Sequence, residues 1–94
     1  MEKLTGLRKV KTAVFISGTG SNLKNLIKFS KLKNSPISII LIISNTTQAK
    51  GLKYANQFNI KKKIFSFQSF ADTEKNISTL LKKEKIKFIC LAGF

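Results

Sequence analysis

The stretch that decides the fold lies at residues 12–29 and reads TAVFISGTGSNLKNLIKF. It begins with an apolar run whose β-branched and aromatic residues are typical of a buried strand, and the glycine-rich segment at 18–20 ends that run. Ser21 and Asn22 are residue types that begin helices well. The apolar residues that follow fall at helical spacing, at Leu23, Leu26 and Ile27. The stretch therefore predicts a strand, a glycine turn and an amphipathic helix.

A strand that feeds a glycine turn into a helix N-terminus directs several backbone N–H groups at one point. The helix dipole adds partial positive charge there, so the natural ligand is an anion, most often a phosphate. Gly18 and Gly20 let the backbone turn tightly and approach the anion without a Cβ in the way. The alternative is a plain glycine turn without a ligand, because such turns are common in α/β domains.

Two familiar phosphate motifs do not fit this turn. The phosphate loop of NTPases ends in Gly-Lys-Ser/Thr, whereas Gly20 is followed by Ser21 and Asn22. The dinucleotide fingerprint needs a third small residue, but position 23 is leucine. It also needs an acidic residue at the end of the second strand, which here ends in Ser44-Asn45. These departures argue against a nicotinamide cofactor.

The rest of the chain continues the alternation of strands and helices. Isoleucine dominates residues 39–43 without polar alternation, as in a strand buried on both faces of a parallel sheet. Asn59 is expected to cap the end of the second helix, and Asp72 or Thr73 the start of the third. The predicted strands are residues 11–17, 38–44, 62–67 and 88–92, and the first two predicted helices are residues 21–32 and 49–58.

This alternation predicts an α/β fold, an open parallel sheet of about four strands with flanking helices. Ligands of such sheets bind beyond the carboxyl ends of the strands. Residues 18–22, Asn45 and Gly93-Phe94 all follow predicted strand ends, so we expect one shared site there. No linker or repeat divides residues 11–94, whereas residues 1–10 form a charged leader that we expect to be loosely ordered.

The net charge of +14 invites a nucleic-acid interpretation. However, seventeen lysines stand against one arginine and are scattered over every element, while base readout favours arginine. We therefore expect no specific nucleic-acid partner, and a basic nucleic-acid-binding module is kept as an alternative. A positive field would also attract a phosphorylated substrate.

Other residue types exclude several classes of site and location. The single cysteine, Cys90, rules out an internal disulfide and suits a reducing cytoplasm. It lies in an apolar run, as a small core residue would. The chain has no histidine, which argues against a metal site. No apolar run has the length of a membrane span, so we expect no membrane partner.

Three segments resemble the phosphoribosylglycinamide formyltransferases, the folate-dependent enzymes of purine synthesis. FISGTGSNL at 15–23 resembles the start of that family, and ISN at 43–45 with Gly51-Leu52 resembles its second strand and next helix. CLAGF at 90–94 resembles its Leu-Ala-Gly-Phe segment. The resemblance implies a Rossmann-like formyltransferase domain of which residues 11–94 are the N-terminal half, so the domain is expected to be truncated.

The resemblance also implies ligands and site residues. In the family, the turn that matches Gly20, Ser21 and Asn22 holds the phosphate of glycinamide ribonucleotide. Gly93 matches a glycine beside the same substrate, and Lys75 lies near the position of a basic residue close to the folate. The implied reaction transfers a formyl group from 10-formyltetrahydrofolate to glycinamide ribonucleotide in purine (IMP) biosynthesis.

The family's catalytic Asn, His and Asp all follow the point that matches Phe94, and no catalytic residue is assigned within this chain. The four carboxylates offer no replacement: Glu2, Asp72, Glu74 and Glu84. We therefore expect the chain alone to be inactive and marginally stable. Three explanations stay open, namely an interrupted gene, a complementary C-terminal half supplied by a second polypeptide, and a fragment that serves as a binding module; the apolar residues near Phe94 favour the first. A further alternative is a fragment similar to formyltetrahydrofolate deformylase, although the first turn of that enzyme lacks the Gly-Thr-Gly-Ser-Asn pattern.

Overall fold

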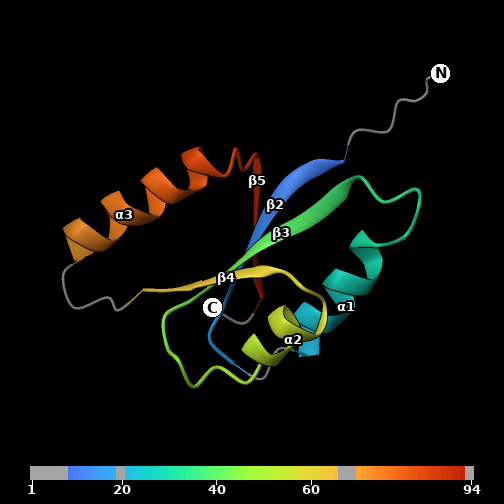
Figure 1. Cartoon of the computed structure of the whole chain (residues 1–94), viewed down its shortest axis with the longest axis horizontal. Helices are drawn as coiled ribbons and strands as arrows, with labels where there is room; N and C mark the ends of the chain where they lie inside the picture. Colours follow the sequence, from blue (N-terminus) through green and yellow to red (C-terminus); the bar gives the residue numbers. More distant parts are fainter. Residues whose placement is uncertain (1–8, 19–20, 66–69, 93–94) are drawn as a thin grey trace.

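The computed structural model describes residues 9–18, 21–65 and 70–92, and shows a four-stranded parallel sheet with helices on both faces (Figure 1). The strands lie in the order β4-β3-β2-β5, and every neighbouring pair is parallel. The open parallel α/β architecture predicted from the sequence is confirmed. In chain order the elements are β2 (Val10–Ile16), α1 (Ser21–Ser30), β3 (Ile37–Ser44), α2 (Leu52–Gln57), β4 (Lys61–Ile64), α3 (Phe70–Lys83) and β5 (Phe88–Ala92).

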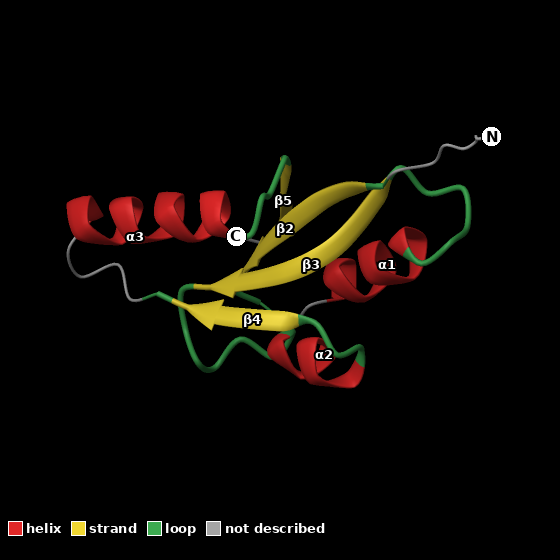
Figure 2. Cartoon of the chain, turned by 45° about the horizontal axis from the view of Figure 1, so that its top comes forward, coloured by secondary structure: helices red, strands yellow, loops and turns green. Residues whose placement is uncertain are grey.

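The order of the strands reverses between β2 and β5. From β2 the chain winds outward through β3 to β4, and α3 then returns it so that β5 pairs with the other side of β2. Helices α1 and α2 pack against one face of the sheet and α3 against the other (Figure 2). In sheets wound both ways, the loops that follow the two strands at the reversal diverge and leave a crevice at their carboxyl ends.

Strand β2 carries apolar side chains to both faces of the sheet. Val14 and Ile16 pack under α1 and α2, while Ala13 and Phe15 pack under α3. This is the period of two that an extended strand imposes on its side chains. Three residues of α3 cover the second face, as their helical spacing predicts, namely Ile77, Leu80 and Leu81.

Strand β3 contains an irregularity that the sequence pattern does not reveal. Thr12 pairs with Ile39 and Ala13 with Leu41, so Ile40 is an extra residue on β3. Because of this bulge, Ile39 and Ile42 face α1 although they are three residues apart. The predicted burial of β3 on both faces is confirmed, with five residues buried and Ile40 half-buried.

Several predicted boundaries were wrong, among them that of α1, which ends at Ser30 rather than at residue 32. Helix α2 begins at Leu52, because the N–H groups of Leu52 and Tyr54 bond three residues back, in tight turns that precede regular helix. Helix α3 begins at Phe70, so Asp72 lies in its first turn, where its charge also favours the helix dipole. Strand β4 covers Lys61–Ile64 rather than 62–67, and residues 66–69 lie outside the described part of the chain.

Helices α2 and α3 end in the same motif. The N–H of Asn59 donates to Asn56 O (3.3 Å) and that of Ile60 to Ala55 O (2.8 Å), and Asn59 has a left-handed φ of 56°. These are the paired bonds of a Schellman turn. The predicted cap was therefore off by one residue: the C-cap of α2 is Phe58, and Asn59 follows it in the left-handed conformation. After α3, Lys85 takes the same position with a φ of 59°, which its residue type does not favour.

Lys9, the first residue that the structure describes, is hydrogen-bonded to the backbone at the end of α1. Lys9 Nζ donates to the carbonyl oxygens of Ser30 (2.6 Å) and Leu32 (2.7 Å), at the negative end of the helix dipole. Residues 1–8 of the predicted leader lie outside the described residues. Within the described part of the chain, no helix has the length and apolar character needed to cross a membrane.

Candidate functional site

A pocket occupies the crevice where the strand order reverses. It lies between α1 and the end of β5 and has a volume of about 400 Å³. We call it the Asn22 pocket, and its lining consists of Asn22, Asn25, Leu26, Leu91 and Ala92. The volume suits a small ligand, and the position is the one at which open α/β sheets bind theirs.

The packing of α1 explains why two asparagines line this pocket. Leu23 and Ile27 are fully buried against the sheet and fix the rotation of the helix. Asn22 and Asn25 lie one turn apart and remain exposed beside the end of β5. Ile16 pairs with Ala92, so the carboxyl ends of β2 and β5 lie side by side.

The electrostatics of α1 favour an anion at its N-terminus. Its first turn contains no acidic residue, whereas the first turn of α3 contains Asp72. The described lining of the Asn22 pocket contains no carboxylate, and Asn22 and Asn25 offer amide N–H donors. The partial positive charge of this helix end is therefore not neutralised by a neighbouring side chain of its first turn.

The loop after β3 supports the turn between β2 and α1. The N–H of Gly51 donates to Gly18 O at 3.2 Å. A Cβ added to Gly18 would meet no atom within 4 Å, so packing does not demand glycine here. Open space beside the backbone is what the close approach of a ligand requires. Asn45 is exposed at the carboxyl end of β3, as its position in the sequence predicts.

The predicted site residues divide into three groups. Gly20 and Gly93 lie outside the described residues. Ser21 is the first residue of α1, and Asn22 lines the pocket. Lys75 lies on α3, across the sheet from α1, in a separate hollow of about 560 Å³ that is lined by Glu74, Lys75, Ser78, Thr79 and Lys82.

The structure thus joins Asn22 to the end of β5 but places Lys75 elsewhere. Sequence reasoning missed Asn25 and Leu26 as lining residues. Their positions three and four residues after Asn22 were the available signal, because such residues share one helix face.

Candidate groups for proton transfer lie away from the Asn22 pocket. Glu74 is on the outer face of α3, and Glu84 follows that helix and accepts a hydrogen bond from Lys61 Nζ at 2.7 Å. This bond, together with nearby lysines, lowers the pKa of Glu84. Cys90 is half-buried and packs against the apolar cluster under α1. The described pocket can therefore orient an anion, and its lining contains no acidic or basic side chain.

The fold and this pocket define an open α/β protein with a small pocket at the strand reversal, and comparison with known proteins specifies the family. Residues 10–94 match the family described as formyl transferase. The chain belongs to the formyl transferase family. The relatives it matches include the phosphoribosylglycinamide formyltransferase of Bacillus subtilis, which is 33% identical over 87 residues, covering 89% of this chain and 45% of that protein.

Two further relatives agree with this assignment. The trifunctional purine biosynthetic protein adenosine-3 of Drosophila melanogaster is 37% identical over 98 residues, covering 99% of this chain and 7% of that protein. The crystal structure of phosphoribosylglycinamide formyltransferase from Brucella melitensis superposes with a TM-score of 0.87 at 32% identity, covering 93% of this chain and 47% of that chain. The chain therefore spans less than half the length of each relative.

Proposed function

We propose that this chain binds the phosphate of glycinamide ribonucleotide as part of a cytoplasmic phosphoribosylglycinamide formyltransferase. The observation that carries the proposal is the N-terminus of α1, which opens at the strand reversal without an acidic residue in its first turn. Membership of the formyl transferase family supports this reading. The positive net charge of +14 would assist the approach of a phosphorylated substrate.

The proposed ligand contacts follow the chain from the first turn to the last strand. Backbone N–H groups from Gly20 to Asn22 bind the phosphate, and the Asn22 amide adds a donor. Gly93, which follows β5 directly, approaches the rest of the ribonucleotide. Lys75 is proposed as a contact of 10-formyltetrahydrofolate, the formyl donor, from its own hollow on α3.

The proposed reaction needs groups beyond those that line the Asn22 pocket. The amine of the ribonucleotide attacks the formyl carbon, so a tetrahedral oxyanion must be stabilised while protons move. We propose that a complementary C-terminal half supplies these groups, and that residues 11–94 alone do not catalyse transfer.

The edge of β5 is the proposed docking place for that half. β5 pairs with β2 on one side, and three of its five side chains are largely exposed. Their exposed fractions are 50% for Phe88, 44% for Ile89 and 70% for Leu91. A strand added beside β5 would pair with the backbone N–H and C=O groups on its open side, and would help to cover these apolar side chains.

Calorimetry tests the proposed ligand. Glycinamide ribonucleotide should give a saturable heat, and Asn22→Asp should weaken binding by about tenfold, because a carboxylate beside the phosphate repels it. Asn22→Asp should also leave the helix intact, since an acidic residue suits a helix N-terminus. Asn34→Asp is the matched control, because Asn34 is exposed and does not line the Asn22 pocket.

The same experiment separates the alternatives. Duplex DNA is titrated at two salt concentrations, and heat from DNA with a steep salt dependence but none from the ribonucleotide would favour a basic nucleic-acid-binding module. Binding of the folate without the ribonucleotide would favour a deformylase-like fragment. Either result would contradict the proposed function.

A further inference from the structure

The two helices on one face of the sheet carry only positively charged side chains. Residues 21–58, which run from the start of α1 past the end of α2, include six lysines and no carboxylate. On the opposite face, residues 70–87 contain α3 and include five lysines and three carboxylates. The lysines are scattered along the sequence but the carboxylates are not, so the fold separates a purely basic layer from a mixed one (Figure 2).

Three lysines of the basic layer form a stripe along α1. Lys24, Lys28 and Lys31 recur at one-turn intervals, so they lie on one side of the helix and follow each other at about 5 Å along its axis. Lys31 directly follows α1 and continues its last turn, since its N–H donates to Ile27 O at 3.1 Å. Lys28 and Lys31 are exposed and Lys24 is half-buried. One anionic strand can therefore meet several of these ammonium groups at once.

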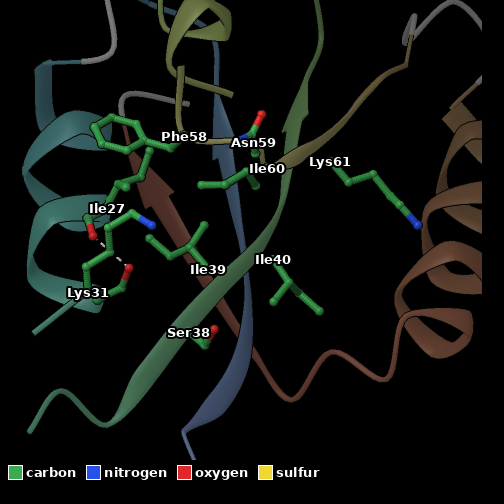
Figure 3. Close-up of a pocket in the computed structure, with 10 residues that line it drawn as sticks. Ile27, Lys31, Ser38, Ile39, Ile40, Phe58, Asn59, Ile60 and Lys61 are labelled. Atoms are coloured by element: carbon green, nitrogen blue, oxygen red, sulfur yellow. Dashed lines mark hydrogen bonds between the residues drawn. The ribbon is translucent and has the colours of Figure 1, made fainter. Parts of the chain in front are cut away.

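Two aromatic rings from α2 and its C-cap lie beside this stripe. Tyr54 and Phe58 are one turn apart and half-buried. Lys24 Nζ lies 5.9 Å from the centroid of the Tyr54 ring, and Lys31 Nζ lies 5.7 Å from that of Phe58. Figure 3 shows the Lys31 side chain extending from α1 toward Phe58. Lys53 of α2 adds a third ammonium group, 5.1 Å from the Tyr54 centroid. We call this surface the α1–α2 seam, namely Lys24, Lys28, Lys31, Lys53, Tyr54 and Phe58.

The lysines of the α1–α2 seam are available to an anionic ligand. Within the part of the chain that the structure describes, none of the four pairs with a carboxylate. Lys61 of β4 differs, because its side chain points away toward α3 and pairs with Glu84 at 2.7 Å (Figure 3). A cation–π contact at an exposed site is weak, so a phosphate can draw an ammonium group away from a ring and leave the face of that ring open.

We propose that the α1–α2 seam binds single-stranded nucleic acid without sequence specificity. The backbone phosphates lie on the four lysines and the bases stack on Tyr54 and Phe58. Proteins bind single strands by such an arrangement, a basic path with aromatic rings beside it, because every base has a face that can stack. Lysine binds phosphate as a point charge, and the scarcity of arginine agrees with binding that reads no bases.

The α1–α2 seam is separate from the proposed ribonucleotide site. It shares no residue with the lining of the Asn22 pocket. The bases of a duplex stack on each other, so a duplex offers fewer base faces to the two rings than a single strand does. An acidic peptide offers negative charge but no bases. These differences define the competitors in the test.

The test uses the intrinsic fluorescence of the full chain, because Tyr54 is its only tyrosine and it has no tryptophan. An oligouridylate of about twelve nucleotides should quench this fluorescence saturably at low salt, and oligodeoxythymidylate of the same length should do so equally. A DNA duplex with the same number of phosphates, and polyglutamate of the same charge, should each bind at least about tenfold more weakly. An excess of glycinamide ribonucleotide should not displace the oligonucleotide.

Two double variants with the same change in charge locate the binding surface. Lys28→Gln/Lys31→Gln should weaken binding by about tenfold at low salt, and should lower the slope of log affinity against log salt by about 1.4, because each lost phosphate contact contributes about 0.7. Lys82→Gln/Lys83→Gln is the matched control, since it removes two exposed lysines on α3. It should change the affinity by less than about threefold.

Several outcomes would overturn the proposal. Equal weakening by the two double variants would show that the net charge acts diffusely. Equal binding of polyglutamate or of the duplex would assign the surface to an acidic protein or to a duplex. Displacement by the ribonucleotide would place the oligonucleotide in the Asn22 pocket, and unchanged Tyr54 fluorescence at saturation would exclude stacking. An unchanged melting temperature confirms that each variant is folded.

Discussion

The two outer strands of the sheet differ in what they expose. β4 presents three consecutive exposed lysines, from Lys61 to Lys63. β5 presents Phe88, Ile89 and Leu91, which are 44% exposed or more. Lysines on an outer strand prevent another strand from pairing with it, whereas an apolar outer strand invites pairing. β4 therefore has the properties of a strand at the outer edge of a sheet, whereas β5 has the properties of a strand inside a larger sheet.

The first prediction compares two leucines with opposite surroundings. Leu41 on β3 is fully buried and Leu91 on β5 is 70% exposed. Leu41→Ala should lower the free energy of unfolding by about 2–5 kcal/mol, because it leaves a cavity. Leu91→Ala should change it by less than about 0.5 kcal/mol. Urea unfolding measures both free energies. If Leu91→Ala lowered the free energy of unfolding as much as Leu41→Ala does, Leu91 would already be covered in solution.

The second prediction concerns association through β5. The chain should self-associate, and the double variant Ile89→Thr/Leu91→Lys should raise the concentration at which this occurs by about tenfold, because it removes the exposed apolar side chains. Sedimentation velocity measures the effect. Lys63→Thr, at an exposed position of β4, serves as the control and should not reduce association. A monomeric, cooperatively melting chain at high concentration would contradict the idea that β5 needs a neighbour.

The third prediction concerns the turns that lead into the two outer strands. Lys85 before β5 and Asn59 before β4 both have left-handed backbones. Lys85→Gly should raise the free energy of unfolding by about 1 kcal/mol, because glycine adopts this conformation without a steric cost. Asn59→Gly should have a smaller effect, since asparagine tolerates it. Thermal and urea unfolding measure both, and destabilisation by Lys85→Gly would refute the explanation.

The fourth and smallest effect concerns the ion pair of Lys61 and Glu84, which links the start of β4 to the end of α3. Folding lowers the pKa of Glu84, because the carboxylate accepts a hydrogen bond from Lys61. The stabilisation by this ion pair is therefore present above the pKa that Glu84 has in the unfolded chain, and it is lost as the pH falls through the pKa that Glu84 has in the folded chain. As the pH is lowered, the urea concentration at the unfolding midpoint should therefore fall less steeply in the Glu84→Gln variant than in the unchanged chain. Identical pH profiles would show that the pair contributes nothing measurable.

Regular packing made much of the fold predictable. The apolar runs at 11–17 and 38–44 located β2 and β3 to within one residue, and residues 88–92 matched β5 in full. Helical spacing identified the inward face of α3, and asparagine's tolerance of a left-handed backbone identified Asn59. Strand alternation also predicted the shared edge at which the Asn22 pocket lies.

Features set by tertiary contacts escaped sequence reasoning. The bulge at Ile40 leaves no mark in a run made almost entirely of isoleucine. Lysine is not a residue type that signals a left-handed turn, so the left-handed conformation of Lys85 was not anticipated. Asp72 fits a helix cap and a first helical turn equally well, which explains the misplaced start of α3. The Asn22 pocket joins α1 to the end of β5, which lie far apart in the sequence, so no local pattern could reveal its full lining.

The most direct measurement of the central claim is an amide NMR titration of the isotope-labelled chain with glycinamide ribonucleotide. The account predicts saturable shifts at the backbone amides of Ser21, Asn22 and Leu23. Those shifts should persist in Asn34→Asp, which changes an exposed residue outside the Asn22 pocket, and weaken by about tenfold in Asn22→Asp. If the amide signals of these three residues did not shift under a large excess of the ribonucleotide, the proposed phosphate site would be contradicted.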